Sequence, residues 1–231
     1  MIRVVVFGVA VAVLPGAGIA LGEAVAALAR EPGAWALGAG CAAGVLLFRP
    51  LLLRYPVLET FEHELTHALA AVCLLRGVRR FKVTLHRGGY VEHSGGSRIG
   101  DDVIGLAPYL LPTLTLGAAL FAPAVPPAGR GPYFAAVGVT FGYHLVSTVR
   151  EVRGSFTKRS FRAAGSRRAI QSDIGSRGYV YSSALILAGI LLTHGVAAAL
   201  LAGGRPAVAA WGRALRDGTL ATGAALVALA R

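Results

Sequence analysis

The order of apolar and polar residues divides the chain into long hydrophobic stretches separated by short polar breaks. A helix needs about 20 apolar residues to cross a bilayer core, and continuous apolar runs suit helices rather than barrel strands. Stretches that approach this length lie at about residues 4–28, 34–53, 57–75, 103–125, 133–149 and 179–201. The pattern therefore predicts an all-α polytopic membrane protein with about six transmembrane helices, within a range of roughly five to seven.

The two ends of the chain fit this pattern less simply. A last apolar stretch, at about residues 207–230, is interrupted by charged residues between 213 and 217, so we expect it to lie partly along the membrane interface. At the other end, Arg3, the apolar run after it and the small residues near Ala20 resemble a signal peptide. Hydrophobicity continues well past Ala20, which favours a permanent span over a cleaved signal.

Two local patterns interrupt the helices. Residues 81–86 and 90–93 alternate between apolar and polar side chains on either side of a glycine pair. Period two around such a pair predicts a small β-hairpin at about residues 79–94. Further on, the two prolines of the segment 108–112 predict a bend within one span, because proline removes helical hydrogen bonds and leaves carbonyls for neighbours to satisfy.

Composition agrees with the membrane prediction and adds an orientation. The chain is 55% hydrophobic and 15% charged, which is unusual for a soluble domain of 231 residues. Its net charge of +12 is concentrated at residues 76–98 and 150–177. The positive-inside rule predicts that these two segments, with Arg30 and Arg231, face the cytoplasm. No aromatic-basic motif accompanies the charge, so we expect no nucleic-acid partner. The two cysteines form no Cys-x-x-Cys pair, which indicates neither a disulfide framework nor a thiolate zinc site.

Candidate chemistry lies in the stretch at 57–75, which contains the pentad His63-Glu64-Leu65-Thr66-His67. Residues four apart share one face of a helix, so the two imidazoles can bind one zinc ion. Glu64 is rotated from that line by about 100° and can lie beside the metal without ligating it, where it can accept a proton from a zinc-bound water. The pattern is typical of a hydrolytic metal site.

A catalytic zinc needs three protein ligands and an open position, and the pentad supplies two. Asp173 is the strongest distant candidate, because the glycines that follow it allow the backbone to bring it into a helix bundle. An aspartate at a helix entrance can also be only an N-terminal cap. Weaker candidates are Glu92, His93, Asp101 and Asp102.

Two further residues have open roles. Glu59 stands one turn before His63 and can either accept a hydrogen bond from that ring or be hydrated at the membrane boundary. His144 lies within the fifth stretch and has three interpretations: a metal ligand, a residue that supports a ligand, or a hydrogen-bonding group between helices.

These motifs together resemble the site-2-protease family of intramembrane zinc metallopeptidases, and more narrowly a compact branch of it. The similarity covers about residues 61–183. It rests on the pentad and the hairpin, and on the segments Gly105–Pro112, Phe141–Leu145 and Gln171–Ile174 followed by Gly178. Two positions depart from the family pattern. Thr66 stands where a small glycine is common and could crowd a helix contact, and Ser172-Asp173-Ile174 replaces the usual Leu-Asp-Gly.

The resemblance implies that His63, His67 and Asp173 are zinc ligands and that Glu64 is the catalytic base. It also implies hydrolysis of a peptide bond in a membrane-associated protein substrate, at a site toward the cytoplasmic side of a bilayer, expected to be the plasma membrane. We expect a single membrane domain over residues 1–231, with N-terminal spans at 1–55, a metallopeptidase core at 56–202 and a C-terminal span at 203–231.

Two other functions remain compatible with the sequence. The first is a catalytically silent family member that acts as a membrane binding or scaffold protein through its basic loops. The second is an ion transporter, since intramembrane histidine and aspartate are also expected there. The absence of an evident inverted repeat counts against the transporter. The sequence leaves the oligomeric state open.

Overall fold

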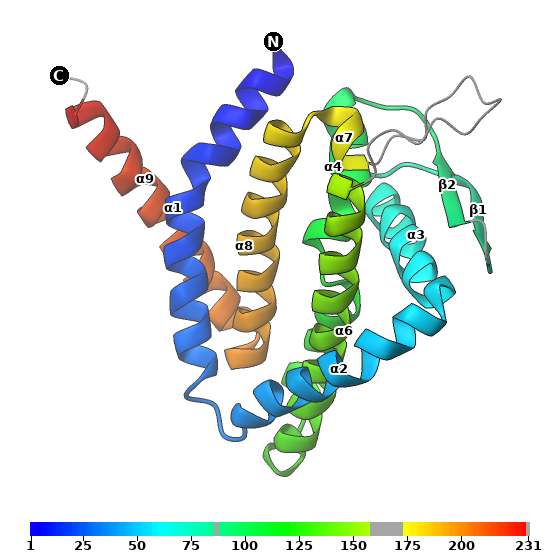
Figure 1. Cartoon of the computed structure of the whole chain (residues 1–231). Helices are drawn as coiled ribbons and strands as arrows, with labels where there is room; N and C mark the ends of the chain where they lie inside the picture. The colour runs from blue at the N-terminus through cyan, green and yellow to red at the C-terminus, as the bar shows by residue number, and fades with distance from the viewer. Residues whose placement is uncertain (86–87, 158–172, 230–231) are drawn as a thin grey trace.

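The computed structural model describes residues 1–85, 88–157 and 173–229 (Figure 1). Its longer helices are α1 (Ile2–Leu28), α2 (Trp35–Arg54), α3 (Pro56–Cys73), α4 (Arg98–Leu110), α6 (Arg130–Thr157), α8 (Tyr179–Gly203) and α9 (Arg205–Leu229). The shorter ones are α5 (Thr113–Ala119), α7 (Asp173–Arg177) and two 3-10 turns, Ala122–Ala124 and Pro127–Gly129. Strands β1 (Val78–Thr84) and β2 (Gly88–His93) pair antiparallel in one hairpin. The predicted all-α class with a small hairpin after the pentad helix is confirmed.

The expected number of spans is not confirmed. Within the described residues, α1, α2 and α8 are long and apolar enough to cross a membrane, and the bent pair of α4 and α5 adds a fourth candidate. The pentad helix α3 has 18 residues, and Glu59, Glu62 and Glu64 lower its mean hydropathy. The same side chains that make α3 chemically interesting therefore remove the continuous apolar character of a simple span.

The predicted proline bend is confirmed. Helix α4 ends at Leu110, and the chain turns by 80° before α5 and the 3-10 turn that follows. The Thr193 hydroxyl of α8 donates a hydrogen bond to the Leu110 carbonyl at 2.5 Å. A neighbouring helix thus satisfies a carbonyl that the break leaves without its helical partner.

Small residues set how closely the helices approach. Helix α2 crosses α6 through two glycine pairs with the same spacing, Gly40 with Gly44 and Gly138 with Gly142. A Cβ on Gly40 would overlap the Ala135 carbonyl oxygen, and the other three glycines meet the facing backbone in the same way. In a bilayer the hydrophobic effect does not drive helices together, so they associate mainly through close van der Waals packing. Small residues at the interface allow such close backbone contact.

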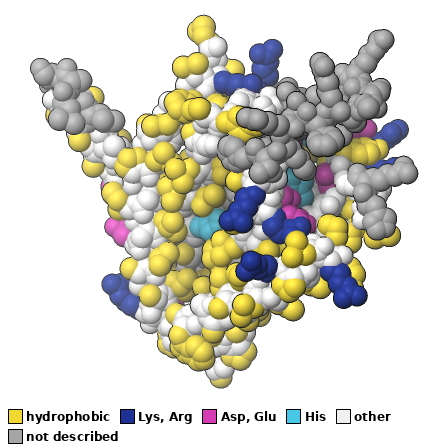
Figure 2. Space-filling model, viewed as in Figure 1, with side chains coloured by type: hydrophobic (Ala, Val, Ile, Leu, Met, Phe, Trp, Pro, Cys, Tyr) yellow, Lys and Arg dark blue, Asp and Glu magenta, His cyan; other side chains and the backbone are white. Residues whose placement is uncertain are grey.

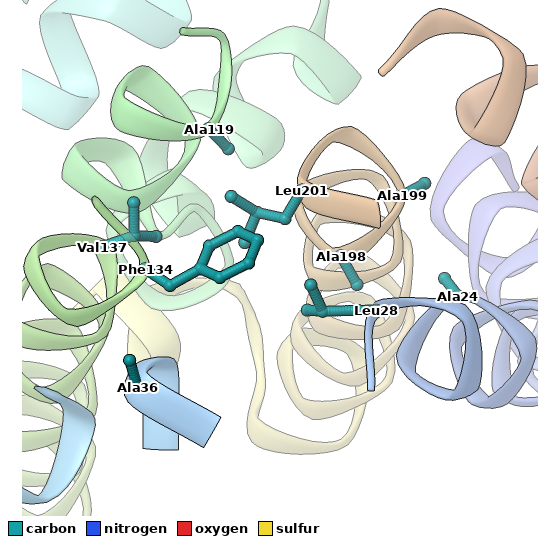
Figure 3. Packing of buried hydrophobic residues seen from close by; sticks show 9 residues of the cluster. All are labelled: Ala24, Leu28, Ala36, Ala119, Phe134, Val137, Ala198, Ala199 and Leu201. Carbon is teal, nitrogen blue, oxygen red and sulfur yellow. The ribbon is translucent and has the colours of Figure 1, made fainter. Parts of the chain in front are cut away.

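A cluster of small and aromatic side chains fills the end of the bundle near the α1–α2 turn. Figure 3 shows Phe134 of α6 pointing toward Leu201 of α8, with Leu28 of α1 nearby. Phe134 is 1% exposed. Elsewhere large apolar side chains face outward, among them Val4, Trp35, Leu46 and Val180. Figure 2 shows hydrophobic side chains over much of the visible helical surface, as expected for helices surrounded by lipid.

One difference from the sequence prediction affects the site. The apolar stretches at 133–149 and 179–201 predict that the basic segment 150–177 is a polar connection between two spans, but α6 continues as a helix to Thr157. Glu151 consequently lies on α6 instead of in a loop. Residues 158–172, which include Gln171 and Ser172 of the family-like segment, lie outside the described residues, as do residues 86–87 of the hairpin turn.

Two ion pairs show which loops share an end of the molecule. Arg3 makes a bidentate pair with the Asp102 carboxylate at the start of α4, with hydrogen bonds of 2.9 and 2.8 Å. Arg130, in contrast, pairs with Glu31 in the α1–α2 turn. The amino terminus therefore lies with α7 and the hairpin, and the turn lies at the opposite end (Figure 1). The expectation that Arg30 shares the side of the hairpin is wrong, because α2 and α3 together carry the chain back across the bundle.

Candidate metal centre

The two pentad histidines converge through the same ring atom. His63 Nε2 and His67 Nε2 lie 3.0 Å apart on one face of α3. Each ring is held from behind at Nδ1: His63 donates to the Glu151 carboxylate at 2.7 Å, and His67 donates to the Ile104 carbonyl at 2.7 Å. Hydrogen-bond partners at Nδ1 fix the orientation of each ring and leave the lone pair of Nε2 available to bind a metal. Metal-binding histidines show this arrangement.

Asp173, the first residue of α7, completes the group. Its Oδ2 lies 3.5 Å from His63 Nε2 and 3.7 Å from His67 Nε2. Burial would raise the pKa of this carboxyl, but the two nearby imidazoles outweigh burial and hold the pKa below its ordinary value. The carboxyl is thus a carboxylate at neutral pH.

The three side chains fit a zinc ion. One ligand atom from each of His63, His67 and Asp173 can be chosen so that all lie within 4.8 Å of one another. Two imidazole nitrogens and one carboxylate oxygen are ligand atoms that zinc commonly binds in proteins, and three protein ligands leave a position for water or substrate. The group opens onto a cavity of about 350 Å³ that Glu64 also lines. On the right of the visible face in Figure 2, beside the grey atoms, histidine and acidic side chains lie close together.

Glu64 lies between the metal group and the hairpin. The residue is 7% exposed, and its side chain packs against Gly89 of β2. A Cβ on Gly89 would lie 2.6 Å from Glu64 Cγ, so the strand can cover the carboxylate this closely only with glycine at that position. The rings of Phe61 and Phe81, 5.9 Å apart, hold the same strand pair against α3.

The structure gives Glu59 a different partner from the one expected. Its carboxylate accepts a hydrogen bond from Arg150 at 3.0 Å, and Glu151 takes the place beside His63. Sequence reasoning missed Glu151 because it counted that residue as part of a polar loop. The available signal was helical spacing, since Glu151 follows His144 by two turns on the same face.

His144 lies outside the metal group and outside the cavity lining. Its buried ring stands 5.7 Å from the ring of His194 on α8, and Thr148 Oγ1 lies 3.4 Å from its Nδ1. The ring therefore contacts a neighbouring helix through His194, whereas the hydrogen-bond partner described for it lies on its own helix.

The weaker candidates for the third ligand have other partners. Asp101 pairs with Arg76, and Glu92 pairs with Arg80 on the neighbouring strand at 3.6 Å. Asp102 accepts the Arg3 contact described above and a hydrogen bond from Tyr181 at 3.1 Å. His93 lines the cavity, and its Nδ1 lies 3.1 Å from the Ser94 carbonyl oxygen.

Thr66, which stands where the family commonly has glycine, is accommodated within a helix contact. It is fully buried, and its hydroxyl lies 2.8 Å from the Thr113 hydroxyl at the start of α5. The Thr66 hydroxyl also donates to the Glu62 carbonyl at 2.9 Å. The extra side chain therefore ties the pentad helix to the bend after α4.

Comparison with known proteins identifies a family. The sequence model of Peptidase M50B-like proteins matches residues 36–165, which include the pentad, His144 and Glu151 and end before Asp173. No curated protein and no solved structure matched the chain. Because the family match covers more than half of the chain and includes the pentad helix, the chain belongs to the Peptidase M50B-like group of the site-2-protease family and is a membrane protein of a peptidase family.

Proposed function

We propose that this protein is a zinc metalloprotease that hydrolyses a peptide bond of a membrane-associated protein at or within the bilayer. The observation that carries the proposal is the convergence of His63, His67 and Asp173 on one cavity that Glu64 also lines. Family membership supports a peptidase, and the lipid-facing helices support a substrate that shares the membrane.

Each residue has a distinct task. His63, His67 and Asp173 would hold the metal, and Glu151 and the Ile104 carbonyl keep the two rings in position. A bound zinc ion lowers the pKa of a coordinated water toward about 7 and polarises a carbonyl oxygen. Glu64 accepts the proton released by the attacking water at its carboxylate, and can pass that proton to the leaving amine.

The hairpin suggests how the substrate is presented. Gly89, Val91 and His93 alternate along β2 with the more exposed residues, and all three line the cavity. A locally unwound substrate segment can hydrogen-bond to the backbone of a strand edge, a mode that requires no particular sequence. Unwinding is needed because a membrane helix keeps its carbonyls in internal hydrogen bonds.

A test separates metal binding from catalysis. We expect Glu64→Gln to keep parental zinc content and to lose cleavage, because the amide cannot accept the proton; loss of a general base typically costs about 10²- to 10⁴-fold in rate. His67→Ala should lose both zinc and cleavage, because a ligand is removed. Metal analysis of the purified protein and cleavage of a single-span reporter, reconstituted with it in liposomes, provide the two measurements.

The outcomes distinguish the proposal from its rivals. Retained cleavage in Glu64→Gln would remove Glu64 from the mechanism. Zinc binding without cleavage of reporter spans by the parent protein would favour a binding role, and zinc flux into the same liposomes would favour a transporter. Parental zinc content in His67→Ala would show that the metal, if present, lies elsewhere.

A further inference from the structure

Asp173, the proposed third ligand, lies on α7, a helix of five residues that is too short to be stable without contacts to the rest of the protein. The residues immediately before Asp173 lie outside the described residues, so the described contacts that fix its position come from α7 onwards. Ile174 supplies one, since it is 1% exposed and packs with Leu106 and Tyr109 of α4. The buried Ser182 hydroxyl of α8 supplies a second contact by donating to the Ile174 carbonyl at 3.1 Å.

Arg177 supplies several more contacts. Its Nη1 donates to the Asp173 carbonyl at 2.8 Å and lies 3.6 Å from Asp173 Oδ1. Its Nη2 donates to the Asp101 carbonyl at 3.0 Å, and its Nε lies 3.2 Å from Asp102 Oδ1. One guanidinium therefore joins the backbone and the carboxylate of the third ligand to the first turn of α4.

The first turns of α4 provide both space and a charged partner for the Arg177 side chain. A Cβ on Gly105 would overlap the guanidinium, so the side chain crosses α4 at a point where only glycine leaves room. The Arg177 side chain is 15% exposed and the Asp102 side chain 2%. Asp102 is itself held by Arg3 from α1 and by Tyr181 from α8. Arg177 is thus anchored to a carboxylate that three helices fix in the bundle.

The two oxygens of Asp173 are divided between two tasks. Oδ2 faces both imidazoles, whereas Oδ1 faces Arg177. A carboxylate held at one oxygen presents the other in a defined direction, which is what partners of metal ligands commonly achieve.

We propose that Arg177 is a positioning residue that fixes Asp173 as the third metal ligand, and that Asp102 holds Arg177 in place. This inference rests on the proposed metal site. Arg177 does not itself bind the metal; it acts through the carboxylate of Asp173. Arg76 offers a matched comparison, because it is another buried arginine that pairs with an aspartate of the same α4 turn, Asp101, and it has no contact with Asp173 among those described.

The test measures zinc affinity by competition with a chelator, using the full-length protein in detergent. We expect Arg177→Ala to weaken zinc binding by about 10- to 100-fold, the usual effect of removing a partner of a metal ligand. Arg177→Lys should show a smaller loss, because it keeps the charge and loses the multiple contacts. Arg76→Ala should stay within about threefold of the parent protein.

A spectroscopic measurement separates positioning from general destabilisation. Cobalt bound in place of zinc reports its ligand set by visible absorption, and we expect the spectrum to change in both Arg177 variants and to be preserved in Arg76→Ala. Should Arg177→Ala fail to fold, Arg177→Lys carries the test on its own.

Parental zinc affinity and cobalt spectrum in the folded Arg177 variants would overturn the inference. Asp173→Ala keeps that failure distinct from failure of the proposed function. If Asp173→Ala loses zinc while the Arg177 variants do not, the metal site stands without the positioning role. If Asp173→Ala keeps parental zinc affinity, the proposed site itself is wrong.

Discussion

At the scale of single residues, the two pentad histidines differ in how they are supported. His67 rests against a backbone carbonyl, which no substitution of a neighbouring side chain can remove. His63 depends on the Glu151 carboxylate, an ionised acceptor that makes a stronger hydrogen bond than a neutral one. His63 is therefore the candidate ligand whose orientation a single substitution can change.

This difference gives a prediction for Glu151. We expect Glu151→Gln to lower zinc affinity by about 10-fold or more, because an amide is a weaker partner for His63 Nδ1 and no longer fixes the ring as firmly. Glu59→Gln is the matched control, since Glu59 is another largely inaccessible glutamate at the contact of α3 with α6, but it pairs with Arg150. Chelator competition measures both. A larger loss in Glu59→Gln than in Glu151→Gln would show that the two glutamates have been assigned the wrong way round.

At the scale of elements, the crossing of α2 and α6 determines where Glu151 is held. Both helices bring their backbones into contact through pairs of glycines, so at these four positions there is no side chain that can adjust. An added methyl group at Gly40 must push the two helices apart, because it would meet the Ala135 carbonyl. The position of α6 against the rest of the bundle therefore depends on residues far from the metal group.

We expect Gly40→Ala to destabilise the protein by about 1–3 kcal/mol, the usual cost of an overpacked contact. Gly38→Ala lies on the same helix, where an added Cβ meets nothing within 4 Å, and should be neutral or slightly stabilising because alanine is the better helix former. Thermal unfolding of both variants in detergent provides the comparison. Equal melting temperatures for the two variants would contradict the close crossing.

At the scale of the whole molecule, charge is distributed unequally between the two ends of the bundle. Arg3, the hairpin and α7 lie at the end of the metal group, whereas Arg30 and Arg130 lie at the other end. When Arg3 is counted with the hairpin and Arg30 is counted at the opposite end, most basic residues of the sequence still fall on the hairpin side, as the positive-inside rule requires. With this path of the chain, the positive-inside rule still predicts that the metal group faces the cytoplasm.

The orientation can be tested with single cysteines. In a background with Cys41 and Cys73 replaced by serine, Arg79→Cys places a thiol on the exposed face of β1, and Ala128→Cys places one in the loop before α6. We expect an impermeant maleimide added outside intact cells to label the Ala128 variant only. The Arg79 variant should react after the membrane is opened. Labelling of Arg79→Cys in intact cells would reverse the assignment.

The sequence by itself determined the features that depend on local spacing. His63 and His67 share a face because residues four apart always do in a helix, and the alternation after Arg76 specified the hairpin because strand side chains repeat every two residues. Proline chemistry specified the bend before Pro112 in the same way. Asp173 was identified as a candidate for its carboxylate and its flexible setting, and the structure brings that carboxylate to the two histidines.

Only the tertiary structure decided the contacts between segments far apart in the chain. His63 and Glu151 are separated by 88 residues, and the helical spacing of Glu151 from His144 does not show which residue of another helix Glu151 meets. Three further features depend on how the helices pack. They are which glutamate binds His63, the end of the bundle at which Arg3 lies, and the contact of the Arg177 guanidinium with Asp173. Packing is decided by the fit of whole surfaces, such as the paired glycines of α2 and α6, and that fit cannot be read from either helix alone.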